Sequence, residues 1–133
     1  MSIAVTGIAH VGIRVHDMDR SVAFYGLFGF EYVMGPIGSE PVAISRHPSG
    51  IEINFILNAA PEATVNVLMD VPVKHPGYTH MALRVKSVDG ARAHLEANGH
   101  TISGEMTFPN GHRAIFVRDP DGNTVELNDT VAD

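Results

Sequence analysis

The sequence has no cysteine, no run of basic residues and no apolar stretch long enough to cross a membrane. Without cysteine, the chain can form neither disulfides nor cysteine–zinc sites, and thiolate catalysis is excluded. A net charge of −6 without a Lys/Arg cluster argues against a surface that follows nucleic-acid phosphates. Residues 1–4 show no basic-plus-apolar secretion signal. We therefore expect a cytoplasmic protein that binds neither nucleic acid nor membrane.

An internal repeat is the strongest feature that is present. The chain has 133 residues, of which 44% are apolar, as expected for one packed domain. Residues 7–15 read GIAHVGIRV, and residues 77–85 read GYTHMALRV, so Gly, His, Arg and Val recur at an offset of 70. One half of such a chain would bury too little surface to be stable alone. The two halves are therefore expected to share a sheet or a core, within one chain or across a dimer.

Each copy of the repeat reads as a β-strand with one polar face. Alternate residues of a strand point to the same side, so His10, Gly12 and Arg14 share a face. His80, Ala82 and Arg84 do the same in the second copy, while the residues between them are mostly apolar. One face of each strand is thus predicted to pack, and the other to present a His and an Arg.

The remaining residues of the two halves also correspond. Asp19 and Asp89 are predicted N-caps of helices over 19–28 and 91–98, which Gly29 and Gly99 close. Strands are predicted over 31–34, 41–46, 51–57, 101–106, 112–118 and 124–128. The predicted fold is therefore α+β, with two βαβββ modules forming a curved mixed sheet in a single domain spanning 1–133. The modules cover about 5–57 and 75–129, and a linker over 58–74 joins them; a short strand or a short helix fits the apolar piece 65–69.

The closing strands of the two halves suggest a metal site. An alignment by residue type has an offset of 72 at Pro48 and Gly50 and of 74 at Glu52, which pairs Glu52 with Glu126 and implies an insertion in a turn. Two His and two Glu side chains suit a divalent ion, and without one the two carboxylates would repel each other. The predicted ligands are His10, Glu52, His80 and Glu126. The alternative to a metal ligand is that residues 51–57 form an edge strand on which Glu52 faces water.

These motifs resemble the vicinal oxygen chelate superfamily, which includes glyoxalase I, bleomycin-resistance proteins and extradiol dioxygenases. The segments that carry the resemblance are residues 8–11, 49–53, 78–82 and 119–127. The resemblance implies one divalent metal per site, Ni, Co, Zn, Mn or Fe, which chelates two neighbouring substrate oxygens. Glyoxalase I-like members use a His/Glu/His/Glu set, whereas extradiol dioxygenases and fosfomycin-modifying thiol transferases use His/His/Glu, with no ligand at the place of Glu52.

The resemblance implies a lyase or isomerase of the glyoxalase I-like type, which moves an α-proton of a small carbonyl compound through an enediolate. Glu126 is the expected base and Glu52 its counterpart. The side chains expected to bind substrate are Arg14, Arg84, Asn54, Asn128 and Arg113. A non-catalytic drug-binding or resistance protein and an extradiol ring-cleaving dioxygenase are the alternatives.

We expect the protein to form a homodimer. The first helix offers Phe24, Tyr25, Leu27 and Phe28, whereas the second offers only Leu95 as a large apolar residue. This asymmetry suggests apolar surface that a second copy would cover. By resemblance to glyoxalase I, each metal would then take His10 and Glu52 from one subunit and His80 and Glu126 from the other.

Overall fold

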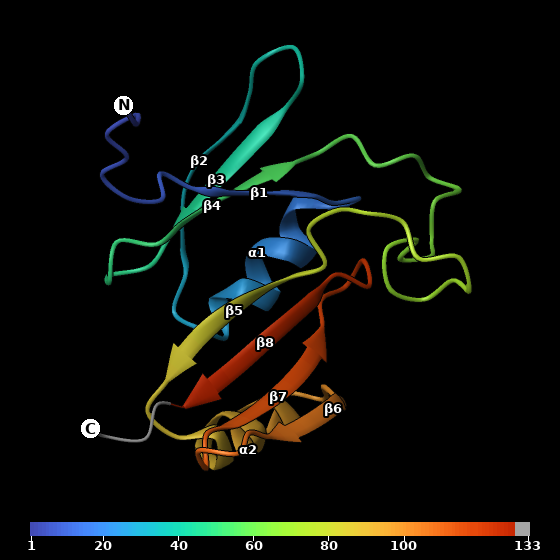
Figure 1. The fold of residues 1–133 in the computed structure, drawn as a ribbon. Coiled ribbons are helices and arrows are strands. Elements are labelled where there is room, and N and C mark those ends of the chain that lie inside the picture. Colours follow the sequence, from blue (N-terminus) through green and yellow to red (C-terminus); the bar gives the residue numbers. More distant parts are fainter. Residues whose placement is uncertain (130–133) are drawn as a thin grey trace. The chain divides into compact units, whose positions relative to one another are not determined.

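A computed structural model describes residues 1–129 of the chain. It divides into two compact units, which we call the first unit (Met1–Ala63) and the second unit (Thr64–Asp133). Each unit is one βαβββ module, so the predicted element order is confirmed (Figure 1). No helix in this part of the chain has the length and apolar character that a membrane span needs.

The first unit is a four-stranded mixed sheet with one helix. Its elements are β1 (Val11–Arg14), α1 (Met18–Gly26), β2 (Glu31–Ile37), β3 (Val42–Arg46) and β4 (Glu52–Ile56). The strand order is β1-β4-β3-β2, with β1 parallel to β4 and the other neighbours antiparallel. The first and last strands of the unit therefore lie side by side, which brings residues before β1 next to the start of β4.

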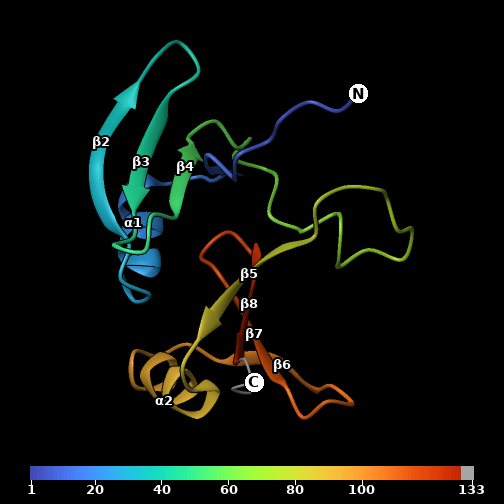
Figure 2. The same cartoon turned by 60° about the vertical axis from the view of Figure 1, so that its left-hand side comes forward.

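The second unit repeats this arrangement. Its elements are β5 (His80–Val85), α2 (Val88–Ala97), β6 (Ile102–Thr107), β7 (Arg113–Arg118) and β8 (Thr124–Asp129). The strand order is β5-β8-β7-β6, and β5 and β8 form the parallel pair (Figure 2). Each module thus builds a mixed sheet of its own.

The N-cap of each helix lies two residues before the predicted cap. The side chain of Asp17 accepts a hydrogen bond from Arg20 N, and that of Ser87 accepts one from Gly90 N. Asp19 and Asp89, the predicted N-caps, lie instead in the first helical turns, where a carboxylate still stabilises the positive end of the helix dipole. The prediction failed because Asp is favoured both as a cap and just after one.

The predicted glycine stops are confirmed. Gly29 and Gly99 have φ values of +91° and +83°, a left-handed region that favours glycine. The residue after each glycine donates its N–H back to the helix, Phe30 to Tyr25 O and His100 to Leu95 O. This pattern is a Schellman-type C-cap, and it occurs at equivalent places in the two units.

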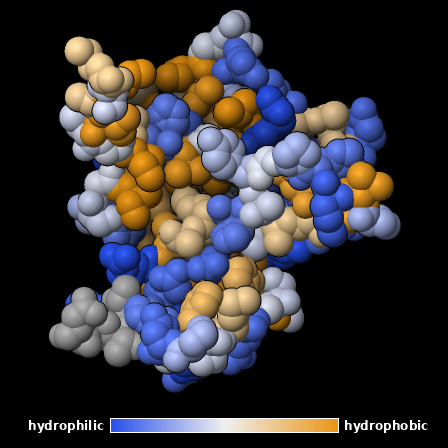
Figure 3. All heavy atoms as spheres, viewed as in Figure 1, coloured by the Kyte–Doolittle hydropathy of each residue, from blue (hydrophilic) through white to orange (hydrophobic). Residues whose placement is uncertain are grey.

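Aromatic side chains form the core of the first unit. Phe24, Tyr25, Phe30 and Phe55 are buried, and the rings of Tyr25 and Phe55 are 5.4 Å apart. The reason given above for a dimer is therefore wrong in part, because the helix rings of Phe24 and Tyr25 pack inside their own unit. The exposed apolar residues of this unit include Tyr32, Val33, Met34 and Ile37 on the edge strand β2. Figure 3 shows apolar residues, coloured orange, at the surface on the face seen in that view.

The core of the second unit is aliphatic. Leu83, Val88 and Leu95 are buried together with side chains of the two central strands, which include Ile115, Val117, Val125 and Leu127. The face predicted to pack on β1 and β5 is confirmed, because Val15 and Leu83 are buried while Arg14 and Arg84 are exposed.

The segment between β4 and β5 contains neither helix nor strand. Its second part is a turn in which the side-chain oxygen of Asn66 accepts hydrogen bonds from Leu68 N and Met69 N. The Asn66 amide donates to Gly122 O, and Arg118 donates to both carboxylate oxygens of Asp70 at 2.6 and 2.8 Å. This turn is thereby attached to the β7–β8 hairpin of its own unit.

Candidate functional site

His80 and Glu126 come together on the second unit. His80 begins β5, and Glu126 lies on the adjacent strand β8, opposite Ala82. The Nε2 atom of His80 is 3.3 Å from Oε1 of Glu126. The Glu126 side chain is only 12% exposed and that of His80 33%, so the pair is open to solvent mainly on the imidazole side. A nitrogen and a carboxylate oxygen, both suitable metal ligands, therefore face each other here.

Neighbouring groups hold this pair in place. The amide of Asn128 donates a 2.6 Å hydrogen bond to Oε2 of Glu126, which leaves Oε1 directed at His80. Thr79 Oγ1 lies 2.9 Å from Nδ1 of His80, and the ring of Phe116 packs edge-on at 5.9 Å. These contacts orient both side chains from their far ends, as supporting groups do around metal ligands.

The pairing of Glu52 with Glu126 in the repeat is wrong. The two hairpins close identically, with Arg46 opposite Glu52 and Arg118 opposite Thr124. The turn hydrogen bonds also match, His47 N to Ile51 O in one unit and Asp119 N to Asn123 O in the other, both at 2.8 Å. The offset is therefore 72 throughout, with no insertion in the turn.

The parallel ladders give the same correspondence. Gly12 lies opposite Asn54 in the first unit, and Ala82 lies opposite Glu126 in the second. Asn54 is thus the structural equivalent of Glu126, and Glu52 is the equivalent of Thr124. The alignment by residue type failed because matching Glu to Glu required a shift by two, which leaves every side chain on the same face of a strand.

Glu52 and Asn54 are two residues apart on β4 and so share a face, but their surroundings differ. Oε1 of Glu52 accepts a 2.8 Å hydrogen bond from the Arg46 guanidinium, which is its neighbour on β3. The Oδ1 atom of Asn54 is buried and has no hydrogen-bond partner within residues 1–129. On this face of β4, the Glu52 carboxylate is therefore engaged in an ion pair, whereas the Asn54 amide oxygen has no partner among the described residues.

The remaining predicted residues of the first unit are His10 and Arg14. His10 was predicted to lie within a strand, but it is the exposed residue immediately before β1. Arg14 Nε donates a 2.9 Å hydrogen bond to Oδ1 of Asn58, and its guanidinium lies 3.8 Å from Glu40. The charge of Arg14 is thus partly neutralised inside its own unit.

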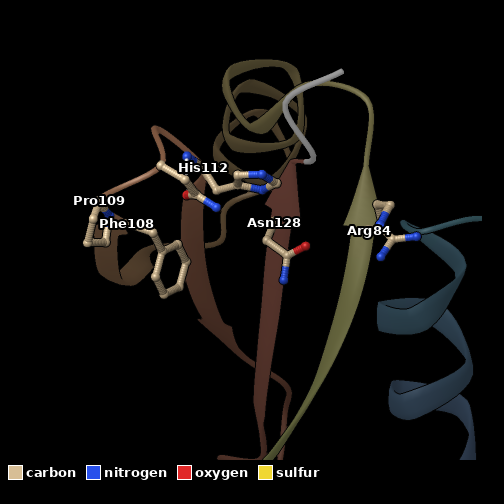
Figure 4. A pocket seen from close by; sticks show the side chains of 6 residues that line it. Arg84, Phe108, Pro109, His112 and Asn128 are labelled. Carbon is tan, nitrogen blue, oxygen red and sulfur yellow. Dashed lines mark hydrogen bonds between the residues drawn. The ribbon is translucent and has the colours of Figure 1, made fainter. Parts of the chain in front are cut away.

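Arg84, the equivalent of Arg14, lies in a different setting. It lines a cavity of about 490 Å³ on the second unit, together with Phe108, Pro109, Asn110, His112 and Asn128. Figure 4 shows Asn128 on β8 between Arg84 on one side and the Phe108–Pro109 segment on the other. The Nδ1 atom of His112 donates to Asp129 O at 2.9 Å, which leaves Nε2 as an acceptor when the ring is neutral.

This cavity adjoins the His80–Glu126 pair because Asn128 belongs to both. Its amide donates to Glu126, while its side chain lines the cavity wall. Arg84 carries a positive charge with no ion-pair partner in the part of the chain that the structure describes. A small molecule in the cavity could therefore place an anionic group at Arg84 and a reacting carbon near Glu126.

Arg113 lies outside this cavity lining. Its guanidinium donates a 2.9 Å hydrogen bond to Asp89 in the first turn of α2. That bond and the charge of Arg113 hold the pKa of Asp89 below its usual value, and the same bond raises the pKa of Arg113. Arg113 thus links β7 to the N-terminus of α2.

The donor set fits a divalent ion in part. Among residues 1–129, no three His, Asp or Glu side chains lie together in a way that could hold a metal. The second unit nevertheless brings imidazole Nε2 and carboxylate Oε1 to 3.3 Å, and a cation would replace their mutual contact by two ligand bonds. In the first unit, taken by itself, the buried and unpartnered Oδ1 of Asn54 is an oxygen of the kind that hard and borderline ions accept.

Sequence reasoning missed three features of this site. Phe108 and Phe116 gave no signal, because aromatic residues in strands and turns are usually packing residues. His112 follows the turn at residues 109–111, where a His is more often a surface residue than a binding one. The role of Asn54 as the counterpart of Glu126 could have been found, because Pro48 and Gly50 already set the offset at 72.

Comparisons with known proteins agree with this architecture. Residues 7–127 match the model of the Glyoxalase/Bleomycin resistance protein/Dioxygenase superfamily. The chain is 29% identical over 127 residues to "Uncharacterized protein YwbC" of Bacillus subtilis, covering 90% of this chain and 94% of that protein. It is 28% identical over 132 residues to the lactoylglutathione lyase of Salmonella typhimurium, covering 90% of each. A glyoxylase/bleomycin resistance protein/dioxygenase domain from Frankia sp. EAN1pec superposes with a TM-score of 0.79 at 20% identity, covering 96% of this chain and all of that one.

Proposed function

This chain belongs to the Glyoxalase/Bleomycin resistance protein/Dioxygenase superfamily, and on that premise we propose that it is a metal-dependent lyase or isomerase of small carbonyl compounds. The substrate carries oxygens on neighbouring carbons, and an α-proton is transferred between those carbons. The observation that carries the proposal is the 3.3 Å approach of His80 Nε2 and Glu126 Oε1, oriented by Asn128 beside a cavity. The similarity to a lactoylglutathione lyase favours this chemistry.

His80 and Glu126 would hold the ion from the second unit, with His10 and a side chain of β4 as the first unit's contribution. Glu52 is the β4 ligand predicted from the sequence. A bound divalent ion would act as a Lewis acid that polarises the carbonyl and stabilises negative charge on its oxygen. Ni, Co, Zn, Mn and Fe all suit such a nitrogen and oxygen set.

The chain's own residues would bind the substrate and move the proton. Glu126 Oε1, when it is released from the ion, would accept the proton as the α C–H bond breaks, while the hydrogen bond from Asn128 fixes the other carboxylate oxygen. Return of the proton to the neighbouring carbon balances the reaction, which needs no oxidant. Arg84 binds an anionic group of the substrate, and Phe108 covers an apolar part of it.

The test is to substitute Glu126→Gln and measure turnover of a hemithioacetal, normalised to bound metal. Loss of a general base should lower the rate by about 10²- to 10⁴-fold. Glu96→Gln is the control, because Glu96 is an exposed carboxylate on α2. Full turnover per bound metal in Glu126→Gln would end the assignment. Ligand binding without turnover, unchanged by a chelator, would favour a non-catalytic drug-binding protein.

A second candidate is an extradiol ring-cleaving dioxygenase. It is favoured by the register, because the first unit has neutral Asn54 where the second has Glu126. A set of two His and one carboxylate with open positions is typical of non-haem iron oxygenases. Oxygen uptake by the Fe²⁺-loaded protein on a panel of catechols, with no hemithioacetal turnover, would select this function over the first.

The proposed working unit is a homodimer that shares its metal sites between subunits. The exposed apolar side chains of β2 are one surface that a second copy could cover. Mixing inactive His10→Ala with inactive Glu126→Ala under subunit exchange should restore activity, because one site of the mixed dimer would be intact. A monomer by light scattering, with no recovery in any mixture, would contradict the shared site.

A further inference from the structure

The two side chains that β4 places on its polar face are not equivalent candidates for a metal site. Glu52 was the expected ligand, but its register partner on β3 is Arg46, and their side chains form a 2.8 Å ion pair. A carboxylate engaged in this way has one oxygen already committed to a cation of its own unit. Binding a metal through Oε1 of Glu52 would require this pair to rearrange, and Arg46 already partly neutralises the charge of the carboxylate.

Asn54 has the opposite character. Its Oδ1 is buried, and no described residue donates a hydrogen bond to it. A buried acceptor without a partner destabilises a protein, so such groups usually have a partner or a function. An amide oxygen is also a recognised ligand for hard cations, although it is weaker than a carboxylate because it is neutral.

Position and surroundings point to the same residue. Both strand ladders of the first unit place Asn54 where the second unit has Glu126, which is 3.3 Å from His80. In the same correspondence, Glu52 takes the place of Thr124, whose hydroxyl donates to the Met69 sulfur rather than lying among ligands. His10 and Asn54 therefore occupy the positions in the first unit that His80 and Glu126 occupy in the second.

We infer that Asn54, and not Glu52, is the side chain through which β4 contributes to the metal site. This inference rests on the proposed function, since it presupposes a metal at His80 and Glu126. It changes the charge of that site, which then has one protein carboxylate instead of two. A divalent ion so bound keeps a net positive charge, which favours substrates that chelate through an anionic pair of oxygens over neutral ones.

The experiment is a titration of the full-length metal-free protein with Mn²⁺, followed by calorimetry and by the loss of the free-ion electron paramagnetic resonance signal. Three variants of this chain are compared with the parent: Glu52→Gln, Asn54→Ala and Asn54→Glu. Glu52→Gln should bind Mn²⁺ within about twofold of the parent, whereas Asn54→Ala should weaken binding by about 10- to 100-fold, the range for disturbing a metal site. Asn54→Glu should bind more tightly, because it supplies the missing carboxylate.

Thermal unfolding without metal separates a ligand from a merely structural residue. Removing an unpartnered buried acceptor should leave the metal-free Asn54→Ala protein as stable as the parent or more stable. Weaker Mn²⁺ binding in Glu52→Gln with parental binding in Asn54→Ala would overturn the inference, as would parental binding in both. Unchanged binding in Glu126→Gln would instead contradict the proposed function, so the two failures are distinguishable.

Discussion

The two units of this chain share their framework and differ in the groups they place on it. Helix caps, hairpin turns and strand registers coincide at offsets of 70 to 72. At equivalent positions, however, the first unit has Asn54 and an Arg14 bound to Asn58 and Glu40, whereas the second has Glu126 and an Arg84 that lines a cavity. Repetition thus preserved the backbone hydrogen bonds and allowed polar positions to diverge.

The cores differ in a similar way. Phe55 and Leu127 occupy equivalent positions on the last strands and are both fully buried. Phe55 contacts the Tyr25 ring in an aromatic cluster, while Leu127 lies among aliphatic side chains. One backbone arrangement therefore accepts two kinds of packing, provided that the buried volume is filled.

The largest expected loss of stability comes from truncating the side chains at these two core positions. Phe55→Ala should lower the free energy of unfolding by about 3–5 kcal/mol, and Leu127→Ala by about 2–5 kcal/mol, because each leaves a cavity. Denaturation followed by circular dichroism measures both. A smaller loss for Phe55→Ala than for Leu127→Ala would show that the aromatic cluster of the first unit closes around the gap.

The next largest effect is on KM, and it should distinguish Arg84 from Arg14. Arg84→Met should raise KM by about 10- to 100-fold for the glutathione hemithioacetal of methylglyoxal, because a charged hydrogen bond contributes about 1.5–3 kcal/mol. Arg14→Met is the matched control and should leave KM unchanged, since its guanidinium is already bound to Asn58 and Glu40.

A second substrate sharpens this test. The 2-mercaptoethanol hemithioacetal has no carboxylate, so Arg84→Met should leave its KM unchanged. An equal rise in KM for both substrates would contradict a role for Arg84 in binding an anionic group.

The helix caps should show that the two units are alike. Asp17→Ala and Ser87→Ala each remove an acceptor from a helix N-terminus and should cost about 1 kcal/mol. Asp17→Asn and Ser87→Thr keep an acceptor and should cost less. Chemical denaturation measures all four variants, and a loss confined to one helix would break the equivalence.

The smallest effect concerns the ion pair of Arg118 and Asp70; Arg46, at the equivalent position, pairs with Glu52 instead. The hydrogen bond from Arg118 lowers the pKa of Asp70 from its ordinary value of 3.8. Because the folded pKa is depressed, the stabilisation is present above pH 3.8 and is lost as pH falls through the folded pKa.

Asp70→Asn should therefore lower the melting temperature slightly at pH 7, and this difference should disappear in strong acid. Scanning calorimetry across pH 2–7 (roughly the range over which carboxylates titrate) checks the sign. A deficit that grows on acidification would contradict the assignment.

Much of the fold was predictable because its signals are local. The βαβββ order, the strand faces and the stops at Gly29 and Gly99 follow from alternation, helical spacing and the left-handed preference of glycine. The helix N-caps were missed by two residues because Asp is common at several positions around an N-terminus. His80 and Glu126 were predicted from the sequence as metal ligands, and the structure places Nε2 of the one 3.3 Å from Oε1 of the other.

Residue types left two registers open for β4, an offset of 72 from Pro48 and Gly50 and one of 74 from matching Glu52 to Glu126. Glu52 and Asn54 are two apart and share a face, so alternation treats them alike. Only the hydrogen-bonded ladders decide that Asn54 lies opposite Gly12 and that Glu52 lies opposite Arg46. The exposure of Arg84 and the neutralisation of Arg14 were hidden for the same reason, because their neighbours Asn128 and Asn58 are far away in sequence.

By itself, the sequence determined the repeated module, since turn chemistry and hydrophobic alternation act over a few residues. The tertiary structure alone decided which polar side chains meet, because strands distant in the chain become neighbours only when their ladders form. It joined His80 to Glu126 and Arg46 to Glu52, and it left the Asn54 oxygen buried without a partner among the described residues.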